Sequence, residues 1–237
     1  MDKYIVEIAE DLSFNPKEFP LSHEIKELLI KYSKDNITLA NGQKIFLNIP
    51  DMEKEKMFDY FQRTLIEFIE SEKLLKKCND IKATYISNIN SINNTSSYVK
   101  MTFDIIKNMD IVNKYIFSVF KIHVDGINNF KTEYVNWIKR TTKIEDNVIE
   151  RWILIHNIRC KLEHPESLET TFFSRTQSEV ILPKIKYEEE FYDLLQLAED
   201  ALSCICLFFK AIIGATLLYS KYLIAFTDES GNALYRN

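Results

Sequence analysis

The sequence predicts an all-α protein, a bundle of four to five long helices with small β-hairpin excursions. Only 4 glycines and 5 prolines occur in 237 residues, too few for the many turns of an all-β sandwich. Hydrophobic residues make up 46% of the chain and aromatic residues 13%, and apolar residues recur at helical spacing over long stretches. A chain of this length accommodates one large domain, or one domain with an appendage.

We expect two parts, an N-terminal appendage over residues 1–50 and a helical domain over residues 51–237. The first helix is predicted over residues 22–34, where apolar residues repeat at i, i+3, i+4 and i+7. Ser22 is expected to cap the start of this helix, and Glu24 suits the helix dipole.

Two β excursions are expected. Residues 37–47 alternate in polarity on either side of Asn41-Gly42. This dipeptide is a strong hairpin signal, because a type I′ turn needs positive φ at both central residues. A second, irregular hairpin or loop is expected over residues 171–182.

Helical spacing continues through most of the remaining chain. It predicts helices over residues 51–77, 99–108, 111–140, 144–164 and 188–226. The Asn- and Ser-rich stretch 88–98 indicates a loop or a weak interruption between helices. Pro165 should end the helix that precedes it.

Residues 201–220 are apolar over about the length of a membrane span. Lys210 lies near the centre of this stretch, where a charge costs about 3 kcal/mol or more in lipid. We therefore expect a buried bundle helix here and no membrane association. The chain begins without a basic segment followed by an apolar one, so a cytoplasmic location is expected.

Neither a metal nor a cofactor is expected. The four cysteines, of which Cys204 and Cys206 point away from each other on the expected helix, are interpreted as reduced thiols without zinc-site spacing. The net charge of −5 argues against nucleic-acid binding over the whole surface. Contact with RNA would need a local basic patch.

Arg159 occupies a core-facing position on the predicted helix 144–164. The apolar stripe that it completes consists of Val148, Trp152, Ile155 and Leu162. Burying an unpaired guanidinium is very costly, so this side chain must face a partner, a cleft or an interface. His156 and Glu163 share its helix face, and Glu163 is one residue that would neutralise it.

His164 follows five residues later, directly before Pro165. The proline disfavours helical backbone at His164, so the helix should unwind there and the histidine can turn toward Arg159. Histidine transfers protons near neutral pH, and arginine grips phosphate oxygens. RNA cleavage through the ribose 2′-OH needs these two capacities and no metal. One histidine is too few for two proton transfers, and a two-fold dimer would supply a second.

The segment from Arg159 to His164, followed by Pro165 and a long last helix, resembles the HEPN domain. That family carries an arginine, four to six residues and a histidine late in the third long helix of a four-helix core, and the resemblance covers about residues 51–226. It implies a metal-independent endoribonuclease acting as a homodimer in toxin–antitoxin or antiviral defence. Arg159 would stabilise the phosphate, and His164 would be the general acid or base.

The resemblance leaves a second function open. Other members are non-catalytic modules that bind RNA, nucleotide or a protein, and an antitoxin or a nucleotidyltransferase is the kind of partner implied. Cys160 stands where many active members have Asn, Asp or His after the arginine. Asn157 and His156 are the residues that would compensate. Alternatively, Arg159 and His164 are ordinary cations at a helix end, where they suit the dipole.

Overall fold

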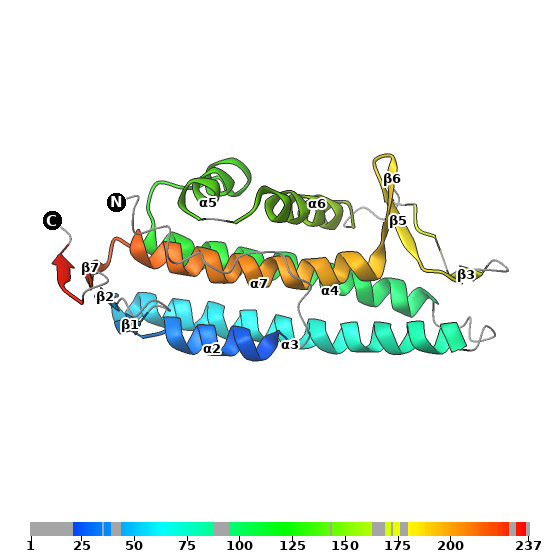
Figure 1. The fold of residues 1–237 in the computed structure, drawn as a ribbon, viewed down its shortest axis with the longest axis horizontal. Helices are drawn as coiled ribbons and strands as arrows, with labels where there is room; N and C mark the ends of the chain where they lie inside the picture. Colours follow the sequence, from blue (N-terminus) through cyan, green and yellow to red (C-terminus); the bar gives the residue numbers. More distant parts are fainter. Residues whose placement is uncertain are drawn as a thin grey trace.

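Four long helices form the centre of the computed structural model: α3 (Asp51–Ser87), α4 (Thr95–His123), α6 (Asp146–Leu162) and α7 (Leu194–Leu218). The structure describes residues 21–34, 36–38, 44–87, 95–142, 144–162, 169–171, 173–175, 180–227 and 231–235. Within them, α3, α4 and α7 run side by side, α2 (Ser22–Tyr32) lies against α3, and α6 packs on α4 and α7 (Figure 1). The predicted helical bundle with small β elements is confirmed.

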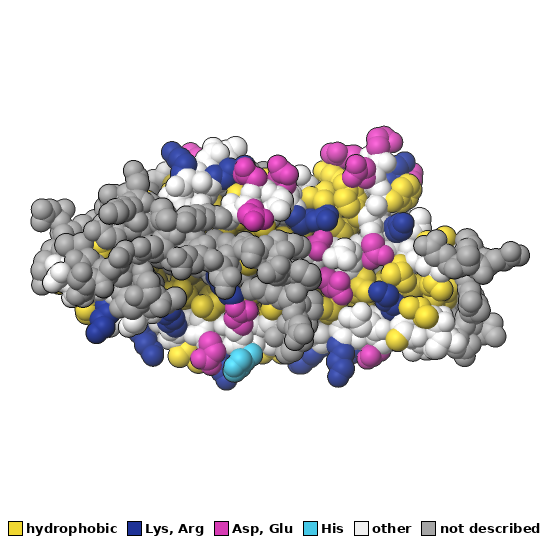
Figure 2. All heavy atoms as spheres, in the orientation of Figure 1, with side chains coloured by type: hydrophobic (Ala, Val, Ile, Leu, Met, Phe, Trp, Pro, Cys, Tyr) yellow, Lys and Arg dark blue, Asp and Glu magenta, His cyan; other side chains and the backbone are white. Residues whose placement is uncertain are grey.

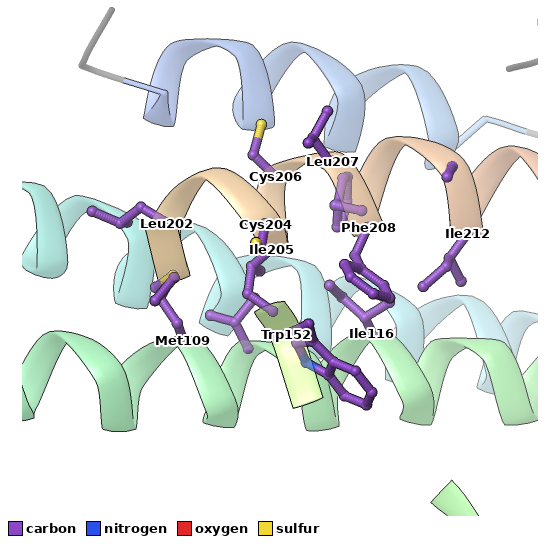
Figure 3. Packing of buried hydrophobic residues seen from close by; sticks show 14 of the residues in the cluster. Met109, Ile116, Trp152, Leu202, Cys204, Ile205, Cys206, Leu207, Phe208 and Ile212 are labelled. Carbon is purple, nitrogen blue, oxygen red and sulfur yellow. The ribbon is translucent and has the colours of Figure 1, made fainter. Parts of the chain in front are cut away.

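The apolar helix α7 supplies much of the core. It contacts α2, α3, α4 and α6, and side chains from three helices meet along it (Figure 3), namely Met109, Ile116, Trp152, Leu202, Ile205, Phe208 and Ile212. Of the described helices, α7 is the one long and apolar enough to cross a membrane, yet 89% of that stretch is buried in the protein. The prediction of a buried bundle helix is confirmed, and Lys210 forms an ion pair with Glu24 of α2.

The two middle helices differ from the prediction. The helix predicted over 51–77 continues to Ser87. The break expected between 99–108 and 111–140 is wrong, because α4 runs unbroken through Asp110. The actual interruption comes at residues 124–129, where Gly126 has a φ of +84° that suits glycine. A short π-helix (Phe130–Tyr134) and α5 (Val135–Thr141) follow.

The last predicted helix, 188–226, is wrong at both ends. The residues before α7 form a hairpin of β5 (Lys184–Tyr187) and β6 (Glu190–Asp193), so the helix begins later than predicted. Asp193 then caps α7 by accepting a hydrogen bond from the Gln196 amide at 3.0 Å. After α7 the chain enters strand β7 (Leu223–Thr227). Helical periodicity alone therefore extended the predicted helix past the Asp193 cap at its start and into strand β7 at its end.

One sheet joins the two ends of the described chain. Its antiparallel strands have the order β1 (Asn36–Thr38), β2 (Lys44–Leu47), β7 and β8 (Ala233–Tyr235). The predicted pairing within 37–47 is confirmed, while Asn41-Gly42 lies outside the described residues. Strands β3 (Ser174–Arg175) and β4 (Val180–Ile181) likewise confirm a hairpin within 171–182. The domain division at residue 50 stays a prediction, although β2 pairs with β7.

The predicted cap of α2 is wrong. Ser22 is the first helical residue, Leu21 holds the cap position, and no side chain of this segment caps the helix. A carboxylate from elsewhere replaces it, because the amides of Leu21 and Ser22 both donate to Oε1 of Glu72 on α3. The sequence around Ser22 carries no sign of this distant partner.

Candidate functional site

A buried aspartate gathers two cationic side chains and a histidine between α4 and α6. The Asp110 side chain is 1% exposed. His156 Nδ1 lies 2.6 Å from its Oδ1, Arg159 Nε lies 3.1 Å from its Oδ2, and Lys114 Nζ lies 3.3 Å from the same Oδ2. We call Asp110, Lys114, His156, Arg159 and Cys160 the Asp110 cluster.

Helix geometry explains why these residues meet. Asp110 and Lys114 are four apart on α4, and His156 and Arg159 are three apart on α6, so each pair shares one helix face. Because α4 packs against α6, the two faces come together. Buried apolar neighbours of Asp110, namely Ile106, Met109 and Val112, and of Arg159, namely Ile155, Ile158 and Leu162, fix both helices around the charges.

The cluster is graded from the interior to the surface. The exposed fraction of the side chain rises from 11% at His156 to 17% at Arg159 and 50% at Lys114. Burial, the largest influence, raises the pKa of Asp110. The His156 hydrogen bond and the charges of His156, Lys114 and Arg159 together outweigh it, so the pKa is lowered. Asp110 is therefore ionised at neutral pH.

His156 also contacts the thiol of Cys160. The Cys160 Sγ lies 3.7 Å from His156 Nε2, one helical turn along α6. Since Nδ1 faces a carboxylate, which only accepts hydrogen bonds, Nδ1 carries the proton. In the neutral ring Nε2 is then the acceptor for the thiol hydrogen. Trp152 stacks on the imidazole with ring centroids 6.0 Å apart and restrains its orientation.

The structure brings together some of the residues that the sequence indicated. Arg159 does occupy a core-facing position with a charged partner, and His156 shares that partner. Asn157 is partly exposed on the same turn of α6. Glu163 and His164 lie outside the described residues, so the expected approach of His164 to Arg159 stays a prediction.

Asp110 is the hub of the cluster, yet it is not among the site residues that the sequence predicts. A usable signal existed, because Asp110 stands among Ile105, Ile106, Met109 and Val112 on an amphipathic helix. A lone acid on an apolar face requires a partner for the same reason that Arg159 does. Matching two such residues of opposite charge would have paired the helices.

Comparisons with known protein families, with curated proteins and with solved structures find no match for this chain. Its function is therefore argued from its own residues. Within the described part of the chain, no group of three or more His, Cys, Asp or Glu side chains is arranged to hold a metal ion.

Other polar features lie outside the Asp110 cluster. A groove of about 510 Å³ runs between α6 and β6 and is lined by Asn147, Val148, Glu150, Arg151, Leu154, Glu190 and Tyr192. On the face in Figure 2, the coloured Lys and Arg side chains are interspersed with Asp and Glu. This mixture is typical of a solvated surface, so the low exposure of the Asp110 cluster distinguishes it.

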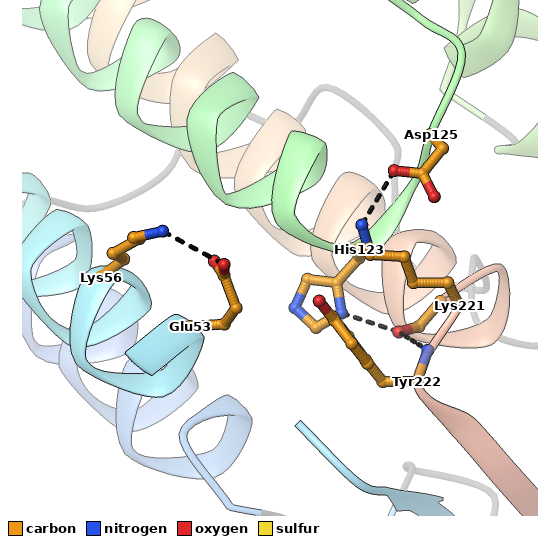
Figure 4. A network of polar contacts seen from close by, with 7 residues as sticks. Glu53, Lys56, His123, Asp125, Lys221 and Tyr222 are labelled. Atoms are coloured by element: carbon orange, nitrogen blue, oxygen red, sulfur yellow. Dashed lines mark hydrogen bonds and ion pairs between the residues drawn. The ribbon is translucent and has the colours of Figure 1, made fainter. Parts of the chain in front are cut away.

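A second polar network lies at the C-terminal end of α4, where it connects this helix to neighbouring segments. His123 is fully buried, with Nδ1 2.8 Å from Ser220 Oγ and Nε2 3.2 Å from Met57 Sδ. Lys221 pairs with Asp125 beside it at 2.8 Å (Figure 4). These contacts join α4 to the segment that connects α7 with β7.

Proposed function

We propose that this protein is a metal-independent endoribonuclease of the HEPN type that acts as a homodimer. The observation that carries the proposal is the ion pair that fixes Arg159 on Asp110 in the last turn of α6. Among the described residues, α6 is the third of the four long helices, a position that agrees with the one the resemblance implies. The histidine of the motif, His164, follows within two residues of the helix end.

The chemistry assigned to the site needs a fixed cation and a proton carrier. Asp110 holds the Nε edge of the Arg159 guanidinium, which orients its planar fork. The terminal amino groups are the ones assigned to the phosphate oxygens. Asp110 is thus a positioning residue, and it acts on RNA only through Arg159.

The reaction is a transfer of the phosphoryl group within the RNA. One histidine takes the proton of the ribose 2′-OH, and the 2′ oxygen attacks phosphorus. The bond to the 5′ oxygen breaks, and a second histidine gives that oxygen a proton. His164 of each protomer supplies one of the two histidines, which is why the proposal requires a dimer. Arg159 stabilises the charge that grows on the phosphate.

The test is cleavage of labelled RNA by the purified chain in EDTA. Wild type should cleave RNA, and a substrate with a 2′-deoxy nucleotide at each cleaved position should resist. Arg159→Ala and His164→Ala should each lower the rate by about a hundredfold or more. His23→Ala is the matched control, because His23 is exposed on α2. Sedimentation of the same samples should show a dimer.

Variants must be shown to fold before activity is compared. Arg159→Ala removes one of the two permanently charged cations that face Asp110, so its thermal midpoint is measured first. His164→Ala lies beyond α6 and carries the test if Arg159→Ala unfolds. RNA left intact by wild type in EDTA, or cleavage at wild-type rate by both alanine variants, would refute the enzyme.

The ion pair between Asp110 and Arg159 also favours a second, non-catalytic function. Asp110 neutralises charge on Arg159 within one chain, and Cys160 replaces a stronger hydrogen-bonding residue. A non-catalytic module that binds RNA, nucleotide or a protein partner fits both facts. It predicts that wild type binds labelled RNA in EDTA without cutting it, and that Arg159→Ala weakens that binding.

Expression in cells separates the two functions further. The ribonuclease, in a toxin or defence setting, should slow growth when its synthesis is induced, and His164→Ala should restore growth. The binding module should leave growth unchanged in both forms.

A further inference from the structure

We infer that Cys160 is an activated thiol that forms a mixed disulfide with low-molecular-weight disulfides of the glutathione type. The Cys160 Sγ faces His156 Nε2 at 3.7 Å, and His156 Nδ1 faces Asp110 Oδ1 at 2.6 Å. A nucleophile, a base and a carboxylate that orients the base thus stand in line, the arrangement that activates cysteine. This inference does not depend on the proposed ribonuclease activity.

The four cysteines of the chain differ sharply in their surroundings. Cys160 is partly exposed, whereas Cys78, Cys204 and Cys206 are buried. Burial raises the pKa of Cys78 to about 12, and burial, together with the weaker effect of Asp200, raises that of Cys204 to about 12. These two thiols remain protonated and shielded, which makes them inert. They serve as internal controls in the same molecule.

The environment of Cys160 favours charge separation. When the thiol proton moves to His156 Nε2, the imidazolium remains hydrogen-bonded to Asp110, and Arg159 lies on the same carboxylate. The thiolate therefore forms next to the imidazolium of His156.

The reaction is thiol–disulfide exchange. His156 takes the Cys160 proton, and the sulfur anion attacks one sulfur of the small disulfide. A new bond forms from Cys160 Sγ to that sulfur, the original S–S bond breaks, and the leaving thiolate takes the proton from His156. One disulfide is consumed and one is formed, so no further oxidant is needed.

The test uses the intact chain and glutathione disulfide as the probe. Mass spectrometry of the folded protein should show one glutathionyl group, and peptide mapping should place it on Cys160. The same reaction is then followed in the urea-unfolded chain, where Cys160 is an ordinary thiol. Activation predicts that Cys160 reacts about tenfold or more faster in the folded chain. Cys78, Cys204 and Cys206 should react only after unfolding.

A variant isolates the role of the histidine. His156→Gln removes the base but keeps a polar side chain, and it should slow the reaction of Cys160 by about tenfold or more. Labelling of the buried cysteines in the variant reports any unfolding, so a folding defect is recognised directly. Equal rates for Cys160 in the folded and unfolded chains, or adducts that appear first on Cys78 or Cys204, would overturn the inference. If His156→Gln unfolds, the folded-to-unfolded comparison in wild type decides alone.

Discussion

His156 Nδ1 lies 2.6 Å from Oδ1 of Asp110, across two helices and 46 residues of sequence. The other carboxylate oxygen of Asp110 faces Arg159 at 3.1 Å. One buried acid on α4 thereby holds a histidine and an arginine of α6. The stability of this arrangement depends on the carboxylate, because its removal would leave His156 and Arg159 largely buried without their acidic partner.

The first prediction is that Asp110→Asn destabilises the protein strongly. The neutral amide cannot offset the charge of Arg159, and its single oxygen replaces the two carboxylate oxygens that face His156 and Arg159, whose side chains are 11% and 17% exposed. The expected loss in free energy of unfolding is about 3 kcal/mol. Urea unfolding at pH 7, followed by circular dichroism, measures it.

The control for this prediction is Asp59→Asn, the same chemical change at a surface pair. Asp59 and Arg63 are both about half exposed on α3, so the loss should stay below about 0.5 kcal/mol. A similar loss in the two variants would mean that burial of Asp110 adds nothing to its ion pairs.

The second prediction concerns Asp200, a buried carboxylate with the opposite pKa shift. Burial is the largest influence and raises the pKa of Asp200, although Gln196 and Arg151 partly offset it. A raised acid pKa means that the folded state binds protons more readily than the unfolded state. The free energy of unfolding should therefore fall as the pH rises through the folded pKa of Asp200 and this side chain becomes ionised.

Acid titration of stability should separate the two carboxylates. The free energy of unfolding of wild type should exceed that of Asp110→Asn by less as the pH falls below about 4. A carboxyl whose pKa is lowered in the folded state adds stability that is complete above its ordinary pKa and is lost as the pH falls through the folded pKa. Relative to Asp200→Asn, wild type should instead gain stability on acidification. At pH 7, Asp200→Asn should cost less than about 1 kcal/mol. Curves that shift in the same direction would refute this assignment.

The sequence was most informative where one helix buries a continuous apolar stripe. Such stripes located α2, α6 and much of α3, and the stripe on α6 placed Arg159 against the core. The charge of Lys210 also predicted that α7 belongs to the bundle and not to a membrane, and in the structure Lys210 pairs with Glu24. These inferences depend on local spacing, which the sequence records directly.

Partners from distant segments could not be read in the same way. Asp110 lies between the helices predicted over 99–108 and 111–140, whereas in the structure it lies within the unbroken α4 and pairs with His156 and Arg159 of α6. The end of α7 was missed because Leu223 and Ala225 continue an apolar sequence that now pairs with β2. A strand of this kind is defined by its neighbour more than by its own residues.

The third prediction is that His123 makes the protein acid-sensitive. Burial first, and then the charge of Lys221, lower its pKa to about 4. The unfolded chain takes up the proton near pH 6.5, so stability is complete above that pH and is lost as the pH falls toward 4. The loss assigned to this residue is on the order of 3 kcal/mol.

Substitution by glutamine checks that assignment. His123→Gln keeps a polar group near Ser220 but cannot titrate. Its free energy of unfolding should change much less than that of wild type between pH 7 and pH 4.5. The exposed His23 provides the comparison, since His23→Gln should leave the pH dependence of wild type intact. Parallel curves for wild type and His123→Gln would show that His123 is not the titrating group.

The fourth prediction is that α2 depends on Glu72 and not on Ser22. Glu72 accepts the amides of Leu21 and Ser22, so its carboxylate satisfies two N–H groups at the start of the helix and suits the dipole. Glu72→Ala should cost about 1 kcal/mol and speed hydrogen exchange in α2. Ser22→Ala should stay within about 0.5 kcal/mol of wild type. Glu70→Ala, which removes only an exposed pair with Lys73, controls for the loss of one charge from α3. If Ser22→Ala proved the more damaging, the hydroxyl would be the cap after all and the contact with Glu72 would be incidental.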